Sequence, residues 1–477
     1  MTTPTTKKDR LIINLLLISA FVVILNETVM GVAIPHLMED LNITALAAQW
    51  LTTAFLLTMA VVIPTTGFLI QRISTRRLYV IAMGLFVAGT AIASIAPGFE
   101  VLLLGRIVQA CGTAIMLPLL MTTVMNLEPH ETLGRRMGNI SIVIAVAPAL
   151  GPTISGLILS NLNWRFLFVF VLPIAITMLI IGIRKMHNVG KIIKAPIDIP
   201  SIILSVFGFG GVVFGLSSLG ETSAGGNPAL LFVPLIVGVL ALGVFIRRQI
   251  ILQRTDRALL NLQTFKTPTF TASIIMFVVS MMGMFGIFIL LPLYLQNVLG
   301  LSVLNSGLLF LPGSLLMGLL APFVGRLYDK VGPRPLLLFG TIVATASLWT
   351  LAFLLKENTS WVVFLIGHIS FSIGLAFIFT PLFTSSLGSL PKHLYAHGSA
   401  TVSTVQQVAG AAGTALFISI MSGIAATAIS RGASQAEGFA EGIHVALLLG
   451  AATVSLSIVT AFFIKKAKTT AGAPAGH

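Results

Sequence analysis

Two charged residues lie deep inside apolar stretches of the sequence, and their types suit proton exchange. Glu27 stands eight residues before Pro35, about 12 Å from the end of a helix that stops there. Arg106 stands six residues after Glu100 and is about 9 Å deep by the same rise per residue. A charge inside the bilayer costs at least ~2.5 kcal/mol, so a retained charge usually serves a function.

These two residues predict a proton or cation site. Burial of a carboxyl group and a neighbouring guanidinium act on its proton affinity in opposite directions, which can place proton exchange near neutral pH. Because arginine keeps its charge, Glu27 is the member of the pair that titrates. The alternatives are a static ion pair, or an Arg106 held by Asn26 and carbonyl groups to lock the helices together.

A glycine–proline pair predicts a bend in another apolar stretch. Within residues 147–156, Gly151 and Pro152 stand side by side, and Gly156 follows. A proline in mid-helix removes a hydrogen bond and bends the axis, and small residues let helices approach closely. We predict that Gly151, Pro152 and Gly156 shape a seal or hinge between two open states, with ordinary packing as the alternative.

Other residues are candidates for the walls of a substrate cavity. Residues 280–288 are rich in methionine and phenylalanine, which suits varied hydrophobic ligands but also suits a core or a lipid-facing helix. Trp50 starts another apolar stretch and fits either an interfacial anchor or a cavity wall. The candidate walls are Trp50, Met284, Phe288 and Phe371.

Several classes of protein are excluded or disfavoured. No G-x-x-x-x-G-K-[ST] motif occurs, so ATP is not expected to drive the protein. No cluster of metal-ligating residues stands within the apolar stretches, which argues against a metal-dependent membrane enzyme. The single cysteine, Cys111, excludes an intramolecular disulfide. We expect no enzymatic activity, no metal and no cofactor.

The elements that must position these residues are transmembrane helices. Of the 477 residues 56% are hydrophobic and 9% are charged, whereas soluble domains are about 25% charged. Lipid offers the backbone no hydrogen-bond partners, so the spans must be helical. Each apolar segment approaches the ~20 residues that cross a bilayer. The fourteen predicted spans are about 12–35, 48–70, 77–97, 100–126, 136–160, 166–186, 198–219, 228–247, 269–295, 304–325, 335–355, 360–385, 400–425 and 443–464.

The basic residues predict the direction of these spans. If the amino terminus lies inside, 24 of the 28 lysines and arginines fall in inner loops and tails, and three fall outside. Such a bias is typical of cytoplasmic loops and places both termini in the cytoplasm. The net charge of +14 is thus spread over many short loops, so we expect no nucleic-acid partner. The first apolar run continues without a cleavage site and is interpreted as a retained span.

An internal repeat divides the chain into two halves. Residues 67–77 match 325–334 at an offset of 258, and 105–112 match 367–374. Two homologous six-span bundles, 11–186 and 269–464, then flank the segment 187–268, which holds an inserted pair at about 198–219 and 228–247. The remaining segments, 1–10 and 465–477, are cytoplasmic ends. Repeated halves around a central site are a recurrent design of secondary transporters.

The repeat places His368 at the position of Arg106. Because the unperturbed pKa of histidine is about 6.5, His368 is a candidate for a second titrating group. A hydrogen-bonded buried histidine is the alternative.

These motifs resemble the major facilitator superfamily, specifically its fourteen-span drug:proton antiporter branch. Residues 67–77 resemble the loop motif G-x-L-x-D-R-x-G-R-[KR], and 325–334 resemble its second copy. Arg106 and Gln109 with Gly112 are similar to the R-x-x-Q-G-x-G motif, whose arginine the family uses in proton coupling. Residues 147–156 resemble the exporter motif G-x-x-x-G-P-x-x-G-G, and 25–35 resemble L-D-x-T-x-x-N-x-A-L-P. The Asn-Glu-Thr form at residues 26–28 is similar to the lincomycin-type multidrug exporters.

Two residues depart from the family patterns. Asn26 stands where the family commonly has aspartate, and Glu27 follows it. Successive helical residues are about 100° apart, so Glu27 points elsewhere unless the helix rotates or unwinds. Gln71 replaces the loop aspartate, whereas Asp329 keeps it in the second copy.

The resemblance implies an all-α integral membrane protein with two six-helix bundles and two inserted helices. It implies a proton-driven exporter of hydrophobic small molecules, cationic ones included, that works as a monomer in the cell membrane. Glu27 would bind the proton, and Arg106 with Asn26 and Gln109 would modulate it. The loops would latch the bundles in the outward-facing state through Gly67, Gln71, Arg72, Arg76 and Arg77 in one copy, and Gly325, Asp329 and Arg334 in the other.

Other functions stay open at this point. A dedicated exporter of a single metabolite, lipid or siderophore fits the same residues. A non-transporting membrane receptor or assembly subunit is disfavoured because almost all loops are shorter than about 25 residues.

Overall fold

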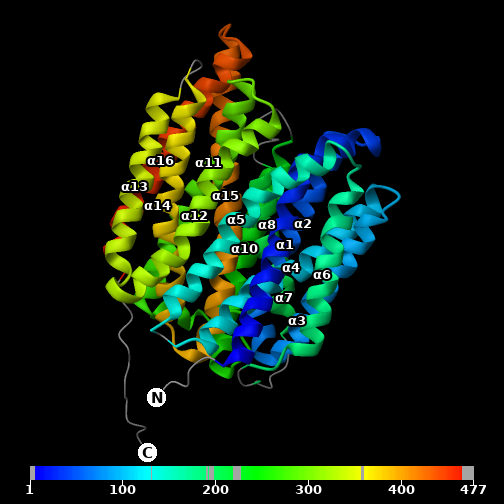
Figure 1. The fold of residues 1–477 in the computed structure, drawn as a ribbon, viewed down its shortest axis with the longest axis vertical. Coiled ribbons are helices and arrows are strands. Elements are labelled where there is room, and N and C mark those ends of the chain that lie inside the picture. The colour runs from blue at the N-terminus through cyan, green and yellow to red at the C-terminus, as the bar shows by residue number, and fades with distance from the viewer. Residues whose placement is uncertain are drawn as a thin grey trace, which may run out of the picture.

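Long helices run side by side in two bundles with an inserted pair against them (Figure 1). The computed structural model describes residues 6–129, 131–189, 192, 198–218, 227–355 and 359–464. The first bundle holds α1 (Lys7–Asp40), α2 (Ala45–Arg72), α3 (Thr75–Ser94), α4 (Phe99–Leu127), α5 (Leu133–Leu159) and α6 (Arg165–Lys185). The second holds α11 (Pro268–Asn297), α12 (Val303–Val331), α13 (Pro333–Leu354), α14 (Trp361–Gly388), α15 (Tyr395–Ser430) and α16 (Gln435–Ala461).

The inserted pair consists of one composite helix and one regular helix. The first is α7 (Ile199–Ser205), a π-helical turn η1 (Val206–Gly210) and α8 (Gly211–Ser217) in series, and the second is α10 (Ala229–Leu252). Two short 3₁₀ turns, η2 (Gln253–Thr255) and η3 (Leu262–Lys266), lead from α10 into α11. A third, η4 (Lys392–Leu394), precedes α15.

The predicted all-helical membrane fold is confirmed. Fourteen helices among the described residues are long and apolar enough to cross a bilayer. One boundary differs in a way that matters, because α1 continues through residue 35 to Asp40. Glu27 therefore stands about 20 Å from the end of its helix by the 1.5 Å rise, rather than about 12 Å. The predicted end 465–477, residues 1–5 of the predicted end 1–10 and the Pro152 side chain lie outside the described residues.

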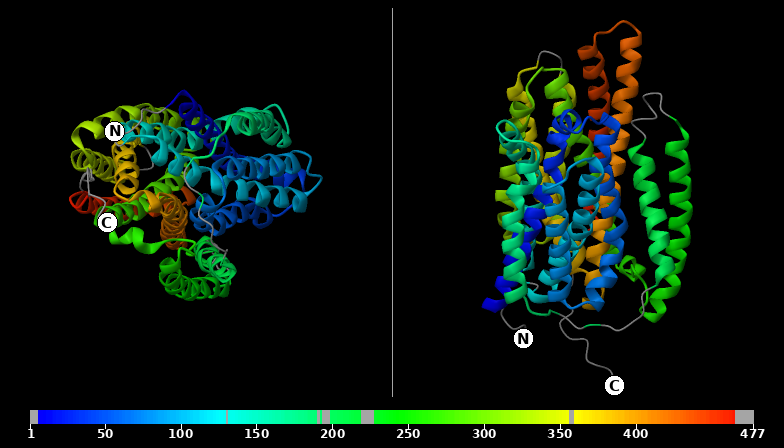
Figure 2. Two further views of the ribbon diagram at one scale, coloured as in Figure 1. Left: turned by 90° about the horizontal axis from the view of Figure 1, so that it is seen from below. Right: turned by 90° about the vertical axis from the view of Figure 1, so that its right-hand side faces the viewer.

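The two bundles touch along two seams. The larger seam joins α5 to α12, and the other joins α2 to α15. The inserted pair lies against the second seam, because η1 and α8 pack on α2 and α8 also packs on α15. Seen along the helices, the bundles lie side by side with the inserted pair at their edge (Figure 2). The pair therefore contacts both bundles at once.

A salt bridge closes the base of the inserted pair. The two carboxylate oxygens of Asp198, the residue before α7, accept hydrogen bonds from Nε and Nη2 of Arg248 on α10, both at 2.7 Å. Arg248 and the cap bonds from Ser201 lower the pKa of Asp198 to about 2. This bridge makes its full contribution to the free energy of unfolding when the pH is above the pKa of aspartate in an unfolded chain. The contribution is lost only as the pH falls toward 2. The pair thus keeps its base closed at every physiological pH.

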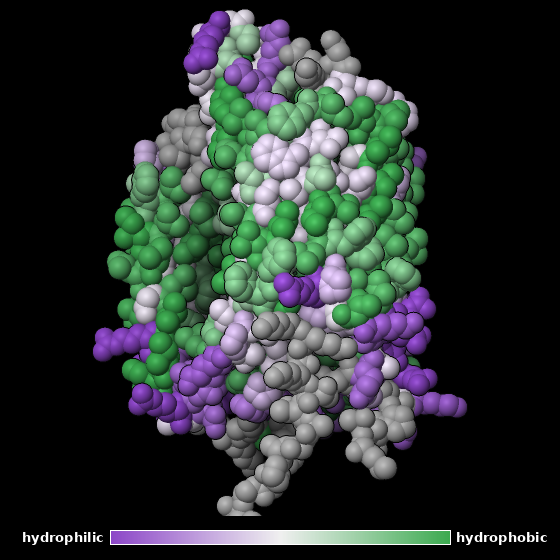
Figure 3. Space-filling model, turned by 90° about the vertical axis from the view of Figure 1, so that its left-hand side faces the viewer, coloured by the Kyte–Doolittle hydropathy of each residue, from purple (hydrophilic) through white to green (hydrophobic). Residues whose placement is uncertain are grey.

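One end of the molecule is basic. The α2–α3, α4–α5, α12–α13 and α14–α15 connections meet there with their arginines and lysines, and we call it the basic end. Figure 3 shows one face of the molecule, where apolar side chains cover the middle and hydrophilic ones gather mainly at the lower end. This distribution fits a molecule that stands across a bilayer.

Candidate functional site

Arg106 lies at the centre of a buried polar network in the first bundle. The side chain is fully buried, and its Nη1 donates to Asn26 Oδ1 at 3.2 Å and to Gln109 Oε1 at 2.7 Å. Gln109 Nε2 donates in turn to Thr90 Oγ1 at 2.8 Å. The guanidinium carbon stands 4.1 Å from the centroid of the Phe55 ring. The structure thus brings together three of the predicted residues from α1 and α4.

The charge of Arg106 has no counter-ion in contact with it. Within the described part of the chain, Nε and Nη2 of Arg106 form no hydrogen bond, and the residue makes no ion pair. Asn26 and Gln109 are neutral, so they orient the guanidinium without neutralising it. An unpaired buried charge is costly, because nothing replaces the water that it loses. The two free donors can therefore receive a carboxylate.

Glu27 is the carboxylate next to this network. Its side chain is half-buried, and among the described residues it forms no hydrogen bond and no ion pair. It follows Asn26 directly on α1, and Asn26 accepts a hydrogen bond from Arg106. The helical offset of about 100° separates Glu27 from this contact, because Asn26 is the residue that α1 turns toward Arg106. Glu27 and Arg106 therefore do not pair in this conformation.

Helix α5 holds α1 beside Glu27. At Gly151 a Cβ atom would overlap the hydroxyl of Thr28. One turn further along α5, Ser155 Oγ donates to the carbonyl oxygen of Val29 at 2.8 Å. Gly156 lies on another side of α5, where its Cβ would meet Leu304 of α12 at 3.9 Å. Of the two predicted switch glycines, Gly151 touches α1, the helix that carries Glu27, and Gly156 does not.

We expect Gly151→Ala to slow transport by about tenfold, because the added methyl pushes α1 away at Thr28. Overpacking a tight contact costs about 1–3 kcal/mol, and Thr28 is β-branched and cannot rotate away freely. Initial transport rates in vesicles with equal amounts of protein measure the effect. Gly156→Ala on the same helix is the matched control and should stay close to the unsubstituted rate. Equal rates for both variants would contradict a special role of the Gly151 contact.

The second loop copy joins the bundles at the basic end. Asp329, near the end of α12, accepts hydrogen bonds from the backbone N–H groups of Gly134 at 2.8 Å and Arg135 at 3.1 Å. These N–H groups open α5, where a negative charge is favourable. Gly325 packs directly on Gly134, because a Cβ on either would overlap the carbonyl oxygen of the other. Arg334 instead stacks over Phe462 within its own bundle at 5.3 Å.

The first loop copy reaches α15 and the segment after α10. Gly67 packs on His397, whose Nδ1 would lie 3.0 Å from a Cβ there. Gln71 Nε2 donates to the carbonyl of His393 at 2.9 Å, and Arg72 Nη2 donates to the carbonyl of Asp256. The remaining two residues face elsewhere, since Arg76 bonds the carbonyl of Ile183 on α6 and Arg77 is exposed.

His368 lies in the second bundle, apart from the Arg106 network. It is 1% exposed, and its ring stands 4.6 Å from Phe310 and 5.8 Å from Phe364, between centroids. Neither ring nitrogen has a hydrogen-bond partner among the described residues. The repeat offset of 262 puts Phe371 where the first bundle has Gln109, so the second bundle keeps no polar partner there. The structure thus does not bring His368 together with Glu27.

The predicted cavity walls fall into two places. Trp50 packs against Phe214 of the inserted pair, with 5.7 Å between the ring centroids and the ring planes tilted by 31°. Phe288 lies beside His368 at 6.1 Å between centroids, Met284 is half-buried on the same helix, and Phe371 is buried on α14. Trp50 therefore contacts the inserted pair, and the other three belong to the second bundle.

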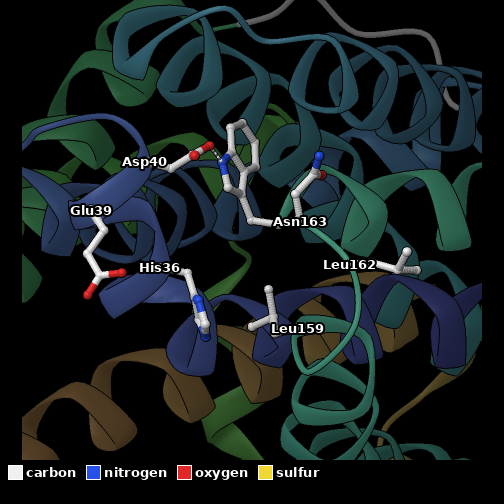
Figure 4. A pocket seen from close by; sticks show the side chains of 7 residues that line it. His36, Glu39, Asp40, Leu159, Leu162 and Asn163 are labelled. Atoms are coloured by element: carbon white, nitrogen blue, oxygen red, sulfur yellow. Dashed lines mark hydrogen bonds between the residues drawn. The ribbon is translucent and has the colours of Figure 1, made fainter.

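A separate pocket of about 290 Å³ lies at the end opposite the basic end (Figure 4). It is lined by His36, Glu39, Asp40, Leu159, Leu162, Asn163 and Trp164. The Trp164 indole donates to Asp40 Oδ2 at 2.7 Å, which ties α1 to the α5–α6 connection. None of the predicted site residues lines this pocket.

Sequence reasoning missed several residues of the site. Phe55 and Thr90 complete the surroundings of Arg106, Thr28 meets Gly151, and Gly134 meets Gly325. These contacts join helices that are far apart in sequence, and no motif links them.

Comparison with known proteins is consistent across sequence and fold. The family model described as Major Facilitator Superfamily matches residues 16–414. The chain is 42% identical over 462 residues to the lincomycin resistance protein LmrB of Listeria monocytogenes, covering 96% of this chain and 97% of the relative. It is 26% identical over 400 residues to the multidrug export protein EmrB of Haemophilus influenzae, covering 84% and 78%.

A solved structure shares the fold. The human organic anion transporter MFSD10 superposes with a TM-score of 0.67 at 13% identity, over 94% of this chain and 99% of that one. The predicted similarity to lincomycin-type multidrug exporters and the predicted two-bundle fold are therefore both confirmed.

Proposed function

The chain belongs to the major facilitator superfamily, and we propose that it is a proton-coupled exporter of hydrophobic small molecules, antibiotics and cationic drugs included. It is a multi-pass plasma membrane protein and a transporter of small molecules. The names of the relatives support drugs as its substrates, because they include lincomycin resistance and multidrug export. One observation carries proton coupling: among the described residues, the buried guanidinium of Arg106 has two donor groups without a hydrogen bond, and the Glu27 carboxylate, which follows Asn26 on α1, forms no hydrogen bond and no ion pair.

Glu27 and Arg106 favour two different conformations of α1, one when Glu27 is ionised and one when it is protonated. An ionised Glu27 is attracted to Arg106, and that attraction is strong where water is excluded. A protonated Glu27 lacks this attraction and leaves Arg106 to Asn26 and Gln109, as in this structure. Gain or loss of a proton therefore changes which face of α1 turns toward α4. A rotation of about 100° moves Glu27 to the present position of Asn26.

Rotation of α1 must pass through its contact with α5. Gly151 touches Thr28, the residue after Glu27, and Ser155 holds Val29. Gly151 and Pro152 thereby couple the proton site to the seam between α5 and α12. Gly156, which faces Leu304 of α12, lies on that seam.

The basic end is the cytoplasmic end in this proposal, so both termini lie in the cytoplasm. The loops at 67–77 and 325–334 hold the two bundles together at this end. The protein is then in its outward-facing state, in which the substrate path opens to the outside of the cell. Inward movement of protons supplies the energy, with no cofactor and no second subunit. Met284, Phe288 and Phe371 contribute an apolar wall to the substrate path, and His368 stands among them as a polar group.

Transport by the purified protein alone tests this function. Proteoliposomes with an imposed pH gradient are given lincomycin or a lipophilic cationic dye, and internal pH is followed with a trapped indicator. We expect each substrate to accelerate dissipation of the gradient and to accumulate against its own gradient. Substrate movement that ignores the pH gradient would overturn proton coupling, and no movement of any probe would overturn export.

A further inference from the structure

We propose that the inserted helix pair, through residues 256–260, is the clasp that holds the α2–α15 seam closed at the basic end. These residues connect α10 to α11 and lie between α2 and α15. The proposal rests on the conformational cycle described above and assigns the inserted pair a place in it.

The two seams are closed by unequal direct contacts. On the α5–α12 seam the carboxylate of Asp329 receives two backbone N–H groups at the start of α5. The repeat offset of 258 places Gln71 at the equivalent position of the α2–α15 seam. Among the described residues, Gln71 makes one neutral hydrogen bond, to a carbonyl oxygen rather than to N–H groups. Hydrogen bonds to an ionised acceptor are roughly twice as strong as neutral ones, so the α2–α15 seam is the weaker one by direct contact.

Residues 256–260 bond to both sides of this weaker seam. From the first bundle, Arg72 of α2 donates to the carbonyl of Asp256. From the second bundle, buried His397 of α15 contacts the carbonyl of Leu259 through Nδ1 at 3.2 Å, which requires the Nδ1–H tautomer. Leu259 and Leu260 are buried with Phe68 of α2 and Ala400 of α15 in one apolar cluster. Separation of α2 from α15 must therefore break contacts with this segment.

The inserted pair anchors the segment from the other side. Gln249 of α10 is fully buried, and its Oε1 accepts the N–H groups of Leu259 at 2.7 Å and Leu260 at 3.3 Å. Its Nε2 donates to Ser201 Oγ at 2.8 Å, and Ser201 bonds to Asp198. Asp198 is the residue paired with Arg248 across the base of the pair. The chain of bonds thus runs from the base of the inserted pair to the seam.

The sequence departure at Gln71 then has a physical reason. A chain that lacks the carboxylate needs another closure on that seam, and the segment after α10 supplies carbonyl acceptors to α2 and α15. Restoring the carboxylate should make the clasp redundant, because an acid there can accept N–H groups at the start of η4 and α15 as Asp329 does at α5.

Distance measurements on the purified full-length protein, without substrate or pH gradient, test the clasp. Spin labels go on Arg10→Cys of α1 and Phe463→Cys after α16, two exposed positions on different bundles, in a Cys111→Ala background. We expect Gln249→Met and His397→Leu, each tested separately, to raise about fivefold the fraction of molecules in which the two labels are far apart. This is the scale expected because each substitution removes buried hydrogen bonds. Adding Gln71→Asp to either variant should return the distances to those of the parent.

The control is Gln263→Met, a glutamine of the same connection whose side chain makes no hydrogen bond among the described residues, and it should leave the distances unchanged. Unchanged distances in both Gln249→Met and His397→Leu would overturn the clasp. Longer distances that Gln71→Asp fails to restore would overturn it too, because the substitutions would then act on packing alone. Neither result bears on proton-driven drug movement, so failure of the clasp and failure of the exporter are separable.

Discussion

Glu27→Gln is expected to reduce pH-driven transport to the level of protein-free vesicles, while the protein still folds and reaches the membrane. Glutamine has the shape of glutamic acid but cannot release or take up a proton. The half-buried carboxylate has no hydrogen-bond or ion-pair partner among the described residues, so its loss breaks no contact that holds α1 in place. The measurement is the initial rate of substrate-dependent proton movement in proteoliposomes, together with substrate binding to the detergent-purified protein.

A matched glutamate on the same helix makes this result specific. Glu39 is exposed at the far end of α1 and lies outside the Arg106 network. Glu39→Gln should transport at the unsubstituted rate, and Glu27→Gln should bind substrate without coupling it to protons. Full pH-driven transport by Glu27→Gln would remove this residue from the mechanism. Loss of transport in both variants would instead point to a general need for negative charge along α1.

Gly325→Ala is expected to slow transport by about tenfold or more and to open the basic end. The added methyl would overlap the carbonyl oxygen of Gly134, a backbone atom that no side-chain rotation can move away. Overpacking costs about 1–3 kcal/mol, and here the cost falls on the closed arrangement of the α5–α12 seam alone. The hydrogen bonds from Gly134 and Arg135 to Asp329 lie at the same place and would lengthen with it.

The same helix supplies the control for this prediction. A Cβ on Gly307 meets nothing within 4 Å, so Gly307→Ala should leave both rate and conformation unchanged. Transport rates and the distance between labels on Arg10→Cys and Phe463→Cys report the two effects together. If Gly325→Ala kept the parent distances and rate, the close approach of Gly134 and Gly325 would have no part in the cycle.

The fold was largely predictable because a lipid solvent leaves the backbone few choices. Fourteen apolar segments of sufficient length had to become helices, and the described residues form fourteen helices that are long and apolar enough to cross a bilayer. The repeat offsets predicted equivalent halves, and the family resemblance grouped Arg106 with Asn26 and Gln109, both of which accept hydrogen bonds from Arg106. Helix ends were less predictable, as the extension of α1 to Asp40 shows, because a helix can continue into water beyond its apolar part.

The sequence by itself determined which charged residues stand inside apolar segments and which residues precede and follow each of them. Only the tertiary structure decided which of Asn26 and Glu27 meets Arg106, which glycine touches which backbone, and what lies across the seam from Gln71. The hydropathy of a segment and the spacing of its apolar residues depend on one helix at a time. The rotation of a helix about its axis and the contacts between helices depend on the side chains of all neighbouring helices together. The link from Gln249 through Leu259 to His397 joins three such elements, and no single segment of sequence contains it.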